Sequence, residues 1–423
     1  MRTVRRVVVT GLGAVTPLGL DVEAYWQGLL AGRSGIGPVT SFDATGFPSR
    51  VAGEVKGFDP RRCMDYKMAR RSGRFSQLGT AAAREALASA GLVVDDTTRD
   101  QIGIVMASSG GLTGFAPQER ILEERGPSRI DPLLVSRLGA HMAGVRVGHA
   151  LGVRGPNTTI NSACASGADA IGHALNLIRL GQTEVMLAGG CEAMVTPLTM
   201  AAMGLVGALT RRNDDPQGAS RPFDGERDGF VMSEGAAVLV LESEEYARRR
   251  GAHILAEVAG AGWSFDAADE TAPDVGGQAE AMARALRDAE ITPADVEYIN
   301  AHGTSTKLND KTETAAIKEV FGQRAYHIPV SSNKSMIGHL AAAAGAVEAV
   351  AAVLTLRDQI LPPTINYRTP DPECDLDYVP NEARPHSVNV CISNSFGLGG
   401  QNACLVLRRY EQTGSTEQGT RKK

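Results

Sequence analysis

The chain has 423 residues, of which 43% are hydrophobic, and a formal net charge of −5. This negative charge argues against binding nucleic acid over a large surface, which requires a basic face. No apolar stretch is long enough to span a bilayer, and the six cysteines lack the CxxC spacing of a zinc site. We therefore expect a cytoplasmic protein with reduced thiols and no metal.

Short runs of β-branched residues predict buried strands along the chain. These runs are Val7–Thr10, Ile102–Met106, Val185–Ala188, Ala237–Leu241, Ile254–Ala259, Val296–Asn300, Ile328–Ser331, Val390–Ser393 and Ala403–Leu407. The helical patterns between them are Ser76–Ala90, Ala165–Leu180, Gly277–Ala289, Lys311–Phe321 and Gly338–Leu356. This alternation of strands and helices predicts an α/β fold.

Two of these predicted helices, Ala165–Leu180 and Gly338–Leu356, are rich in alanine and glycine. Small residues on all sides suit a helix that is buried between two sheets. Each helix follows a strand and a short turn, so the chain contains a faint internal repeat, for which chance similarity is a competing explanation. We expect a five-layer α-β-α-β-α arrangement with two pseudo-repeated halves.

No low-complexity linker divides the chain. We expect residues 1–250 to form the first half, residues 251–412 the second, and residues 413–423 a disordered tail. The polar segment Arg211–Gly229 lies between predicted core strands, so we interpret it as a long functional or interface loop.

Cys164 lies in the segment NSACASG, where a strand ends and a helix begins at or just after the cysteine. Free N–H groups and the dipole at a helix N-terminus lower a thiol pKa and increase the thiolate fraction. Considered alone, however, a free cysteine is more often a buried structural residue.

Two histidines lie at similar edges of predicted elements. His302, in the segment AHGTST, follows the strand Val296–Asn300, where side chains face a cleft in many α/β sheets. His339 lies at the head of the Ala-rich helix, whose positive end favours a neutral imidazole. A neutral imidazole can donate a hydrogen bond to a developing oxyanion. Considered singly, each is explained as well by a satisfied loop or core histidine.

Four sequence segments that are weak signals singly indicate one protein family when they are taken together. NSACASG, AHGTST, SSNKSMIGHLAAAAG and SNSFGLGGQN resemble, in order and spacing, the signature segments of β-ketoacyl-acyl-carrier-protein synthases. The resemblance covers nearly the whole chain, from VVVTGLGAVTPLG to the last strand, and is strongest to the elongating Cys-His-His condensing enzymes of type II fatty-acid and polyketide pathways. It implies a thiolase-like fold.

The resemblance implies a decarboxylative Claisen condensation. Cys164 would accept an acyl chain as a thioester from the phosphopantetheine arm of the carrier protein. His302 and His339 would stabilise the enolate that forms when malonyl thioester loses CO2, and this enolate would attack the acyl group to give a 3-ketoacyl product. The backbone N–H groups of Cys164 and Leu398 would form an oxyanion hole. No cofactor is implied beyond the arm that the substrate brings.

The resemblance also assigns supporting residues. Lys334 would hold the charge and geometry of the site, together with Glu348. The remaining supporting residues are two acids with structural or site-ordering roles and two threonines that would bind the pantetheine arm: Asp310, Glu313, Thr304 and Thr306. A solvated helix start would explain the acids equally well.

The segment Phe396-Gly-Leu398-Gly399-Gly-Gln401 resembles the family's gating loop, with two departures. Many elongating synthases carry Phe at the position of Leu398, and the family usually has Thr at that of Gln401. We expect an altered gate or acyl pocket, which favours a secondary-metabolic synthase slightly over a housekeeping one.

The resemblance implies two protein partners. An acidic acyl carrier protein would meet a basic patch by electrostatic steering, although a solvated helix face explains any single residue equally well. The residues of this patch are Lys67, Arg70, Arg71 and Arg74, with Arg129, Arg211 and Arg212 as further candidates. We also expect a homodimer, or a heterodimer with a homologous subunit, formed through strands near the nucleophile.

Two alternative functions are weighed against an independent synthase. A silent partner subunit that sets chain length would lack the cysteine, so Cys164, His302, Lys334 and His339 argue against it; the chain can still be the active half of such a heterodimer. A related thiolase-fold acyltransferase or hydrolase would use the same cysteine, but Cys391 lacks the CxG motif of thiolases.

Overall fold

The computed structural model describes residues 5–411, so the expected tail at 413–423 lies outside the described residues. Ten strands form one mixed sheet in the order β10-β9-β13-β14-β8-β1-β7-β6-β4-β5. They are β1 (Val7–Val15), β4 (Ile102–Ala107), β5 (Asn157–Ile160), β6 (Val185–Ala193), β7 (Glu234–Ser243), β8 (Ala256–Phe265), β9 (Tyr298–Asn300), β10 (Val330–Ser331), β13 (Val390–Phe396) and β14 (Gln401–Arg408). Two small ladders pair β2 (Ile36–Pro38) with β3 (Val51–Gly53) and β11 (Ile360–Leu361) with β12 (Arg384–Pro385).

The sheet consists of two halves with the same topology, as expected from the repeat. In the first half the order is β5-β4-β6-β7-β1, and in the second it is β10-β9-β13-β14-β8. In each half the first three strands of this order are parallel, the fourth is antiparallel to the third, and the fifth is antiparallel to the fourth. The halves meet where β1 pairs with β8 through Val8 opposite Glu257 and Val9 opposite Ala256.

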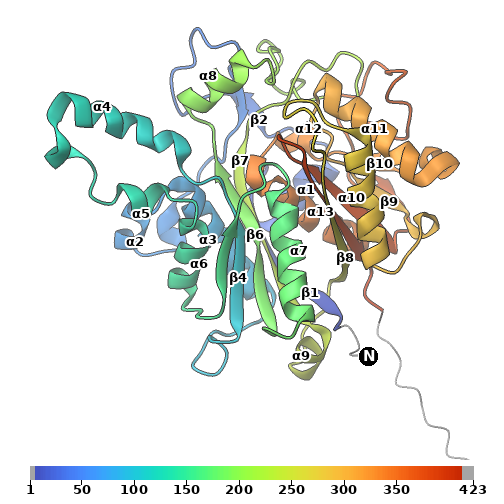
Figure 1. The fold of residues 1–423 in the computed structure, drawn as a ribbon, viewed down its shortest axis with the longest axis horizontal. Helices are drawn as coiled ribbons and strands as arrows, with labels where there is room; N and C mark the ends of the chain where they lie inside the picture. The colour runs from blue at the N-terminus through green and yellow to red at the C-terminus, as the bar shows by residue number, and fades with distance from the viewer. Residues whose placement is uncertain (1–4, 412–423) are drawn as a thin grey trace, which may run out of the picture.

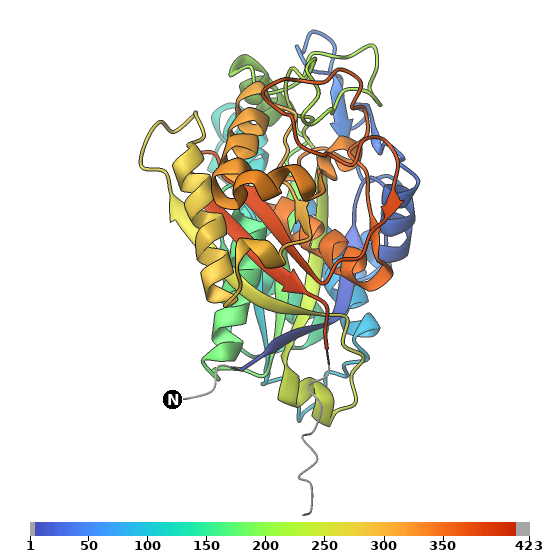
Figure 2. The ribbon, with the colours of Figure 1, turned by 90° about the vertical axis from the view of Figure 1, so that its right-hand side faces the viewer.

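Two central helices lie between the halves, and other helices cover the outside (Figures 1 and 2). Helices α7 (Ser166–Arg179) and α13 (Ala344–Asp358) pack against each other so closely that a Cβ on Gly167 would lie 2.5 Å from the Ala346 nitrogen. The outer helices are α3 (Arg74–Ser89) and α6 (Met142–Leu151) on the first half, and α10 (Val275–Asp288) and α11 (Lys307–Phe321) on the second. This arrangement confirms the expected α-β-α-β-α layers.

The remaining helices are short or peripheral. They are α1 (Val22–Leu30), α2 (Tyr66–Arg70), α4 (Phe115–Arg125), α5 (Leu134–Leu138), α8 (Pro197–Leu205), α9 (Glu244–Arg249) and α12 (Lys334–Ile337). Helix α4, none of whose residues is buried, extends from the body as an arm (Figure 1). Between residues 5 and 411, no helix combines the length and apolar character that crossing a membrane requires.

All nine predicted strands are present, but the predicted helix Gly338–Leu356 is wrong at its start. The chain forms α12, turns at Gly338 (φ +71°), passes His339 and a 3₁₀ turn, and enters α13 only at Ala344. Backbone hydrogen bonds tie His339 to the segment before β7: His339 N donates to Val231 O at 2.7 Å, and Ser233 N donates to His339 O at 3.0 Å. These two hydrogen bonds interrupt the predicted helix and hold His339 outside it.

Candidate active site

The ends of four strands bring the predicted catalytic residues toward one place. β9, β10 and β13 are parallel, so their carboxyl ends lie at the same edge of the sheet. His302 follows β9, Lys334 follows β10, and Phe396 ends β13. Cys164 lies between β5 and the central helix α7.

The nucleophile turn is sharp and strained. Ala163 has a φ of +51°, in the left-handed region that non-glycine residues seldom adopt. Ala165 N donates to Ser162 O at 3.2 Å across the turn, and α7 begins two residues after the cysteine. Cys164 is half-buried, whereas the other five cysteines are buried. The turn therefore presents this one thiol at the N-terminus of the central helix.

Burial raises the pKa of the Cys164 thiol, whereas the neighbouring Leu398 and Cys164 N–H groups and the positive charge of Lys334 act in the opposite direction. The expectation of a lowered thiol pKa is therefore wrong in this structure, because loss of solvent outweighs the helix terminus. The two amides that favour the thiolate are those expected to form the oxyanion hole.

The two histidines face each other. Their ring centroids are 5.4 Å apart with planes at 84°, and Phe230 and Phe396 lie against the rings of His339 and His302. Burial lowers both pKa values well below the ordinary range, and the charge of Lys334 lowers them further. Both imidazoles are therefore neutral at physiological pH.

Hydrogen bonds assign the proton on each ring. Ala341 N donates to His339 Nδ1 at 3.1 Å, which leaves the proton on Nε2. His302 Nδ1 lies 3.4 Å from Lys334 Nζ, and an ammonium there makes Nδ1 an acceptor and Nε2 the donor. The pair therefore offers two N–H donors from neutral rings.

Lys334 and Glu348 form a buried ion pair beside His302. Both side chains are 1% exposed, and Lys334 Nζ also donates to His302 O at 2.7 Å. Burial raises the pKa of Glu348 to about 7, against the opposing effect of Lys334. The pair fixes the position of His302 through its backbone and ring.

The two acids of the following helix organise the loop after His302. Glu313 accepts hydrogen bonds from the His302 and Gly303 amides at 2.8 and 2.7 Å, and burial raises its pKa to about 7. Asp310 accepts from the Thr304 amide at 2.9 Å and from that of the next residue. Both acids are fully buried, so they are not a solvated helix start.

The two threonines predicted to bind pantetheine lie side by side. Thr304 Oγ1 and Thr306 Oγ1 are 2.9 Å apart. The Thr306 hydroxyl also caps α11 by accepting from Asn309 N at 3.3 Å. Thr304 is therefore the freer of the two hydroxyls.

The loop after β13 carries the predicted gate. Phe396 is buried against His302, whereas Leu398 is 58% exposed. Gly399 and Gly400 have φ values of +93° and +83°, which favour glycine. Gly399 N donates to Glu270 O at 2.9 Å, so the loop rests on the segment after β8.

The predicted basic patch is only partly available. Lys67, Arg70 and Arg71 are exposed in and beside α2. Arg74 is also exposed, but its guanidinium pairs with Glu234 and donates to Val55 O. The remaining candidates are the exposed Arg129 and Arg211 and the half-buried Arg212.

The sequence analysis interpreted the polar loop Arg211–Gly229 as functional but did not identify Phe223 within it, or Phe230 directly after it, as residues of the site. Phe223, whose φ is +65°, donates its N–H to Asp310 at 2.8 Å, and Phe230 packs on the ring of His339. The presence of two aromatic residues in and directly after so polar a segment was the sequence signal that could have identified them. The loop therefore forms part of the site, in agreement with its interpretation as functional.

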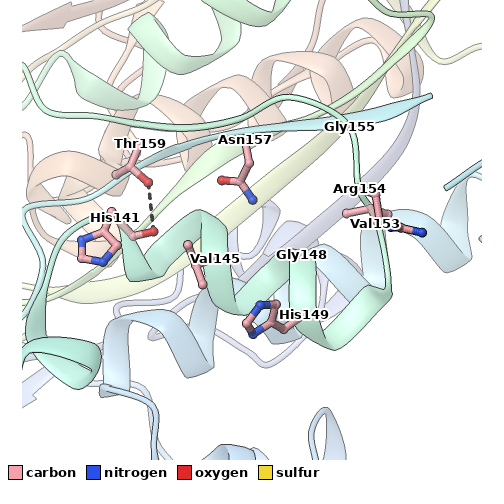
Figure 3. A pocket seen from close by; sticks show the side chains of 9 residues that line it. All are labelled: His141, Val145, Gly148, His149, Val153, Arg154, Gly155, Asn157 and Thr159. Carbon is pink, nitrogen blue, oxygen red and sulfur yellow. Dashed lines mark hydrogen bonds between the residues drawn. The ribbon is translucent and has the colours of Figure 1, made fainter. Parts of the chain in front are cut away.

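A cavity of about 310 Å³ lies between α6 and the edge strand β5 and shares no residue with this site (Figure 3). Its lining includes His141, His149, Asn157 and Thr159.

Within residues 5–411, no three His, Cys, Asp or Glu side chains are grouped to hold a metal ion.

Known proteins resemble the whole chain. Residues 4–247 match "Beta-ketoacyl synthase, N-terminal domain" and residues 255–368 match "Beta-ketoacyl synthase, C-terminal domain". The chain is 48% identical over 410 residues to a 3-oxoacyl-[acyl-carrier-protein] synthase 2 of Synechocystis, covering 96% of this chain and 99% of that protein. The protein of the same name from Coxiella burnetii is 46% identical over 408 residues, with the same coverage.

Solved structures show the same likeness. The ishigamide ketosynthase/chain length factor has a TM-score of 0.90 and 39% identity, covering 97% of this chain and 100% of that one. A type II PKS ketosynthase in complex with its acyl-carrier protein has a TM-score of 0.88 and 37% identity, with the same coverage. A β-ketoacyl synthase from Burkholderia phymatum has a TM-score of 0.91 and 36% identity, covering 96% and 100%.

Proposed function

Because the chain belongs to the β-ketoacyl synthase family and is a condensing enzyme of the acyltransferase class, we propose that it is a 3-oxoacyl-[acyl-carrier-protein] synthase with Cys164 as its nucleophile. One observation carries this assignment of roles. The half-buried thiol lies beside the Leu398 amide, which lowers its pKa, and shares Lys334, as a charged neighbour, with two neutral imidazoles that each keep an Nε2 proton.

The first step is transfer of the acyl group. The Cys164 sulfur attacks the thioester carbon of the acyl carrier protein, and the pantetheine sulfur leaves as a thiol that takes up the cysteine proton. The Cys164 and Leu398 N–H groups stabilise the oxyanion that forms on the carbonyl oxygen. The product is acyl-Cys164 and a free carrier protein.

The second step forms the carbon–carbon bond. His302 and His339 donate their Nε2 protons in hydrogen bonds to the thioester carbonyl of malonyl carrier protein. The bond to the carboxylate breaks, CO2 leaves, and the electron pair forms an enolate that the two donors stabilise. The enolate carbon attacks the acyl thioester and the Cys164 thiolate leaves, which recovers its proton from solvent. Both donors are neutral, because burial and then the charge of Lys334 disfavour the imidazolium form.

The carrier protein would dock on exposed basic residues and deliver its arm to the threonines. Lys67, Arg70 and Arg71 suit an acidic partner, and Thr304 offers a hydroxyl to the arm. One structural relative is a ketosynthase solved in complex with its acyl-carrier protein, which supports this partner. The arm belongs to the substrate, so the proposed reaction uses no resident cofactor. We place the reaction in the cytoplasm.

The exposed edge of β5 supports the expected dimer. β5 ends the sheet, pairs only with β4 among the described strands, and exposes Asn157 and Thr158. The cavity of Figure 3 runs along this strand, where a second subunit would fill it. The partner can be identical or homologous: curated relatives carry the name 3-oxoacyl-[acyl-carrier-protein] synthase 2, whereas one structural relative is a ketosynthase/chain length factor.

Intact mass spectrometry tests the first step. The protein is incubated with a series of acyl carrier proteins, beside a Cys164→Ala control. We expect an acyl adduct on the wild type alone, and the accepted chain lengths separate fatty-acid from polyketide use. Hydrolysis of the adduct in the absence of malonyl carrier protein would contradict the synthase assignment and indicate a thioesterase. If no adduct forms, a repeat with a co-purified homologous subunit distinguishes a missing partner from a wrong substrate class.

A further inference from the structure

A buried carboxylate stands next to the nucleophile turn, and the mechanism above does not use it. Asp169 lies in the first turn of α7 and is 8% exposed. Its Oδ2 accepts a hydrogen bond from the hydroxyl of Ser162, which is 7% exposed. Ser162 precedes Cys164 by two residues, so this bond ties the start of the nucleophile turn to the helix.

The tie holds the most strained part of the site. Ala163 lies between Ser162 and Cys164 in the left-handed region, a conformation that persists only where its surroundings hold it. Ser166 holds the other side of the turn: its hydroxyl accepts from Ser162 N at 2.7 Å and donates to Ala163 O at 2.6 Å. Asp169 thus completes a set of hydrogen bonds around the Ala163 peptide.

Ser162 also contacts the loop that carries the Leu398 amide. A Cβ on Gly397 would lie 2.8 Å from Ser162 O, so the two segments are in close backbone contact. A shift of Ser162 would therefore change the position of the Cys164 turn relative to the Leu398 N–H group. Both amides of the proposed oxyanion hole depend on this one position.

The surroundings of Asp169 indicate a role other than stability. Its Oδ1 is buried and has no hydrogen-bond partner among residues 5–411. Trp263 and the exposed His173 lie nearby, with ring centroids 5.8 Å apart. Burying a carboxylate costs folding free energy, even though Ser162 and Trp263 both act to lower the pKa of Asp169. Its position is better explained by what it does to Ser162.

We propose that Asp169 is a positioning residue for acyl transfer: it anchors Ser162 and thereby keeps the Cys164 thiol aligned with the Cys164 and Leu398 amides. This inference rests on the proposed function. Asp169 touches no reacting atom and acts only through the turn. Its loss should impair the step at Cys164 while sparing the step that depends on His302 and His339.

Four variants of the full chain test this role. Asp169→Ala and Ser162→Ala each remove the bond, whereas Asp169→Asn keeps an oxygen that accepts from the Ser162 hydroxyl. Asn176→Ala is the matched control, because Asn176 lies two turns further along the same face of α7 and its side chain makes no hydrogen bond within residues 5–411. Circular dichroism and melting temperature verify the fold of each variant.

The first readout needs no carrier protein. Iodoacetamide alkylates the half-buried Cys164 in preference to the five buried cysteines, and its rate is followed from about pH 6 to pH 10, around the ordinary thiol pKa. We expect the pH profile of Asp169→Ala and Ser162→Ala to move to higher pH, because the thiolate loses its alignment with the Leu398 amide. Asp169→Asn should restore the wild-type profile. A role in folding alone would leave the profile unchanged.

The second readout separates the two halves of the reaction. In Asp169→Ala, acyl transfer to Cys164 should fall on the order of tenfold to a hundredfold, as expected for a misplaced reacting group. Release of CO2 from malonyl carrier protein by the unacylated variant should stay within about twofold of wild type.

Two results would overturn the inference: wild-type alkylation and acyl transfer in a folded Asp169→Ala, or an equal loss in both halves of the reaction that Asp169→Asn does not restore. Failure of the proposed function has a different signature, because the wild type itself would then form no acyl adduct. The alkylation profiles would still decide whether Asp169 positions the thiol.

Discussion

A single buried charge influences the protonation of all three reacting side chains. The Lys334 ammonium lowers the pKa of the Cys164 thiol and of the His302 and His339 imidazoles. Burial acts with Lys334 on the imidazoles and against it on the thiol, because desolvation always disfavours the charged form. The result is a mostly protonated thiol beside two neutral rings, the states that the proposed mechanism starts from.

Lys334→Met should therefore raise three pKa values together. The thiol loses a favourable charge, so its alkylation should require higher pH than in the wild type. Both imidazoles lose a repulsive charge, so their pKa values should rise toward the ordinary range, as measured by NMR titration of the ring protons.

Glu348→Gln is the matched control for this prediction. The negative charge of Glu348 raises the pKa of Cys164, so its removal should shift the thiol in the opposite direction to Lys334→Met. A thiol pKa that stays constant or falls in Lys334→Met would contradict this account of the electrostatics.

At the level of elements, the close approach of α7 and α13 places the nucleophile turn against the second half of the molecule. Gly167→Ala would put a methyl carbon 2.5 Å from the Ala346 nitrogen. We expect the free energy of unfolding to fall by about 1–3 kcal/mol, which is usual for overpacking. Chemical denaturation measures it. Gly37→Ala, whose Cβ would meet only the end of Lys56 at 3.6 Å, should change stability far less.

The β5 edge should control assembly. Thr158→Lys adds a charge to the exposed edge strand, a change that opposes strand pairing between subunits. We expect a shift from dimer to monomer in sedimentation velocity. Gln323→Lys adds the same charge at an exposed position of the second half and should leave the dimer intact. A dimer equally stable in both variants would place the interface elsewhere.

The gate loop should affect the choice of substrate. Leu398 is exposed on a glycine-rich loop next to Cys164, and a phenylalanine there would be larger and stiffer. In Leu398→Phe we expect a several-fold lower kcat/KM for the longest acyl carriers, with short acyl carriers less affected, whereas Leu398→Met should resemble the wild type. An unchanged product profile in Leu398→Phe would remove the inference of an altered gate.

On the scale of the whole molecule, the chemistry was easier to predict than the geometry. The strand ends before His302 and Lys334 follow from β-branched runs and local motifs. The turn at His339 does not, because it depends on backbone hydrogen bonds to Val231 and Ser233, far earlier in the chain. The raised pKa of Cys164 likewise reflects burial, which only the assembled fold determines.

Other parts of the fold carried weak local signals. Helix α4 buries no residue, so its sequence needs no apolar stripe, and α8 (PLTMAAMGL) is apolar on nearly every side, so it shows no one-sided pattern either. The Asp169–Ser162 bond was also unpredictable, because an acid in a first helical turn normally needs no further explanation. The division of the chain at residue 250 stays a prediction.

The most direct test of the central claim is a single turnover of acyl-Cys164 enzyme with malonyl carrier protein that is isotopically labelled in its free carboxyl group. The account predicts that one labelled CO2 is released for each acyl group lost from Cys164, with an equal amount of 3-ketoacyl carrier protein. Cys164→Ala should form no 3-ketoacyl product. Loss of the acyl group as free acid while the label stays on the carrier protein would contradict the claim.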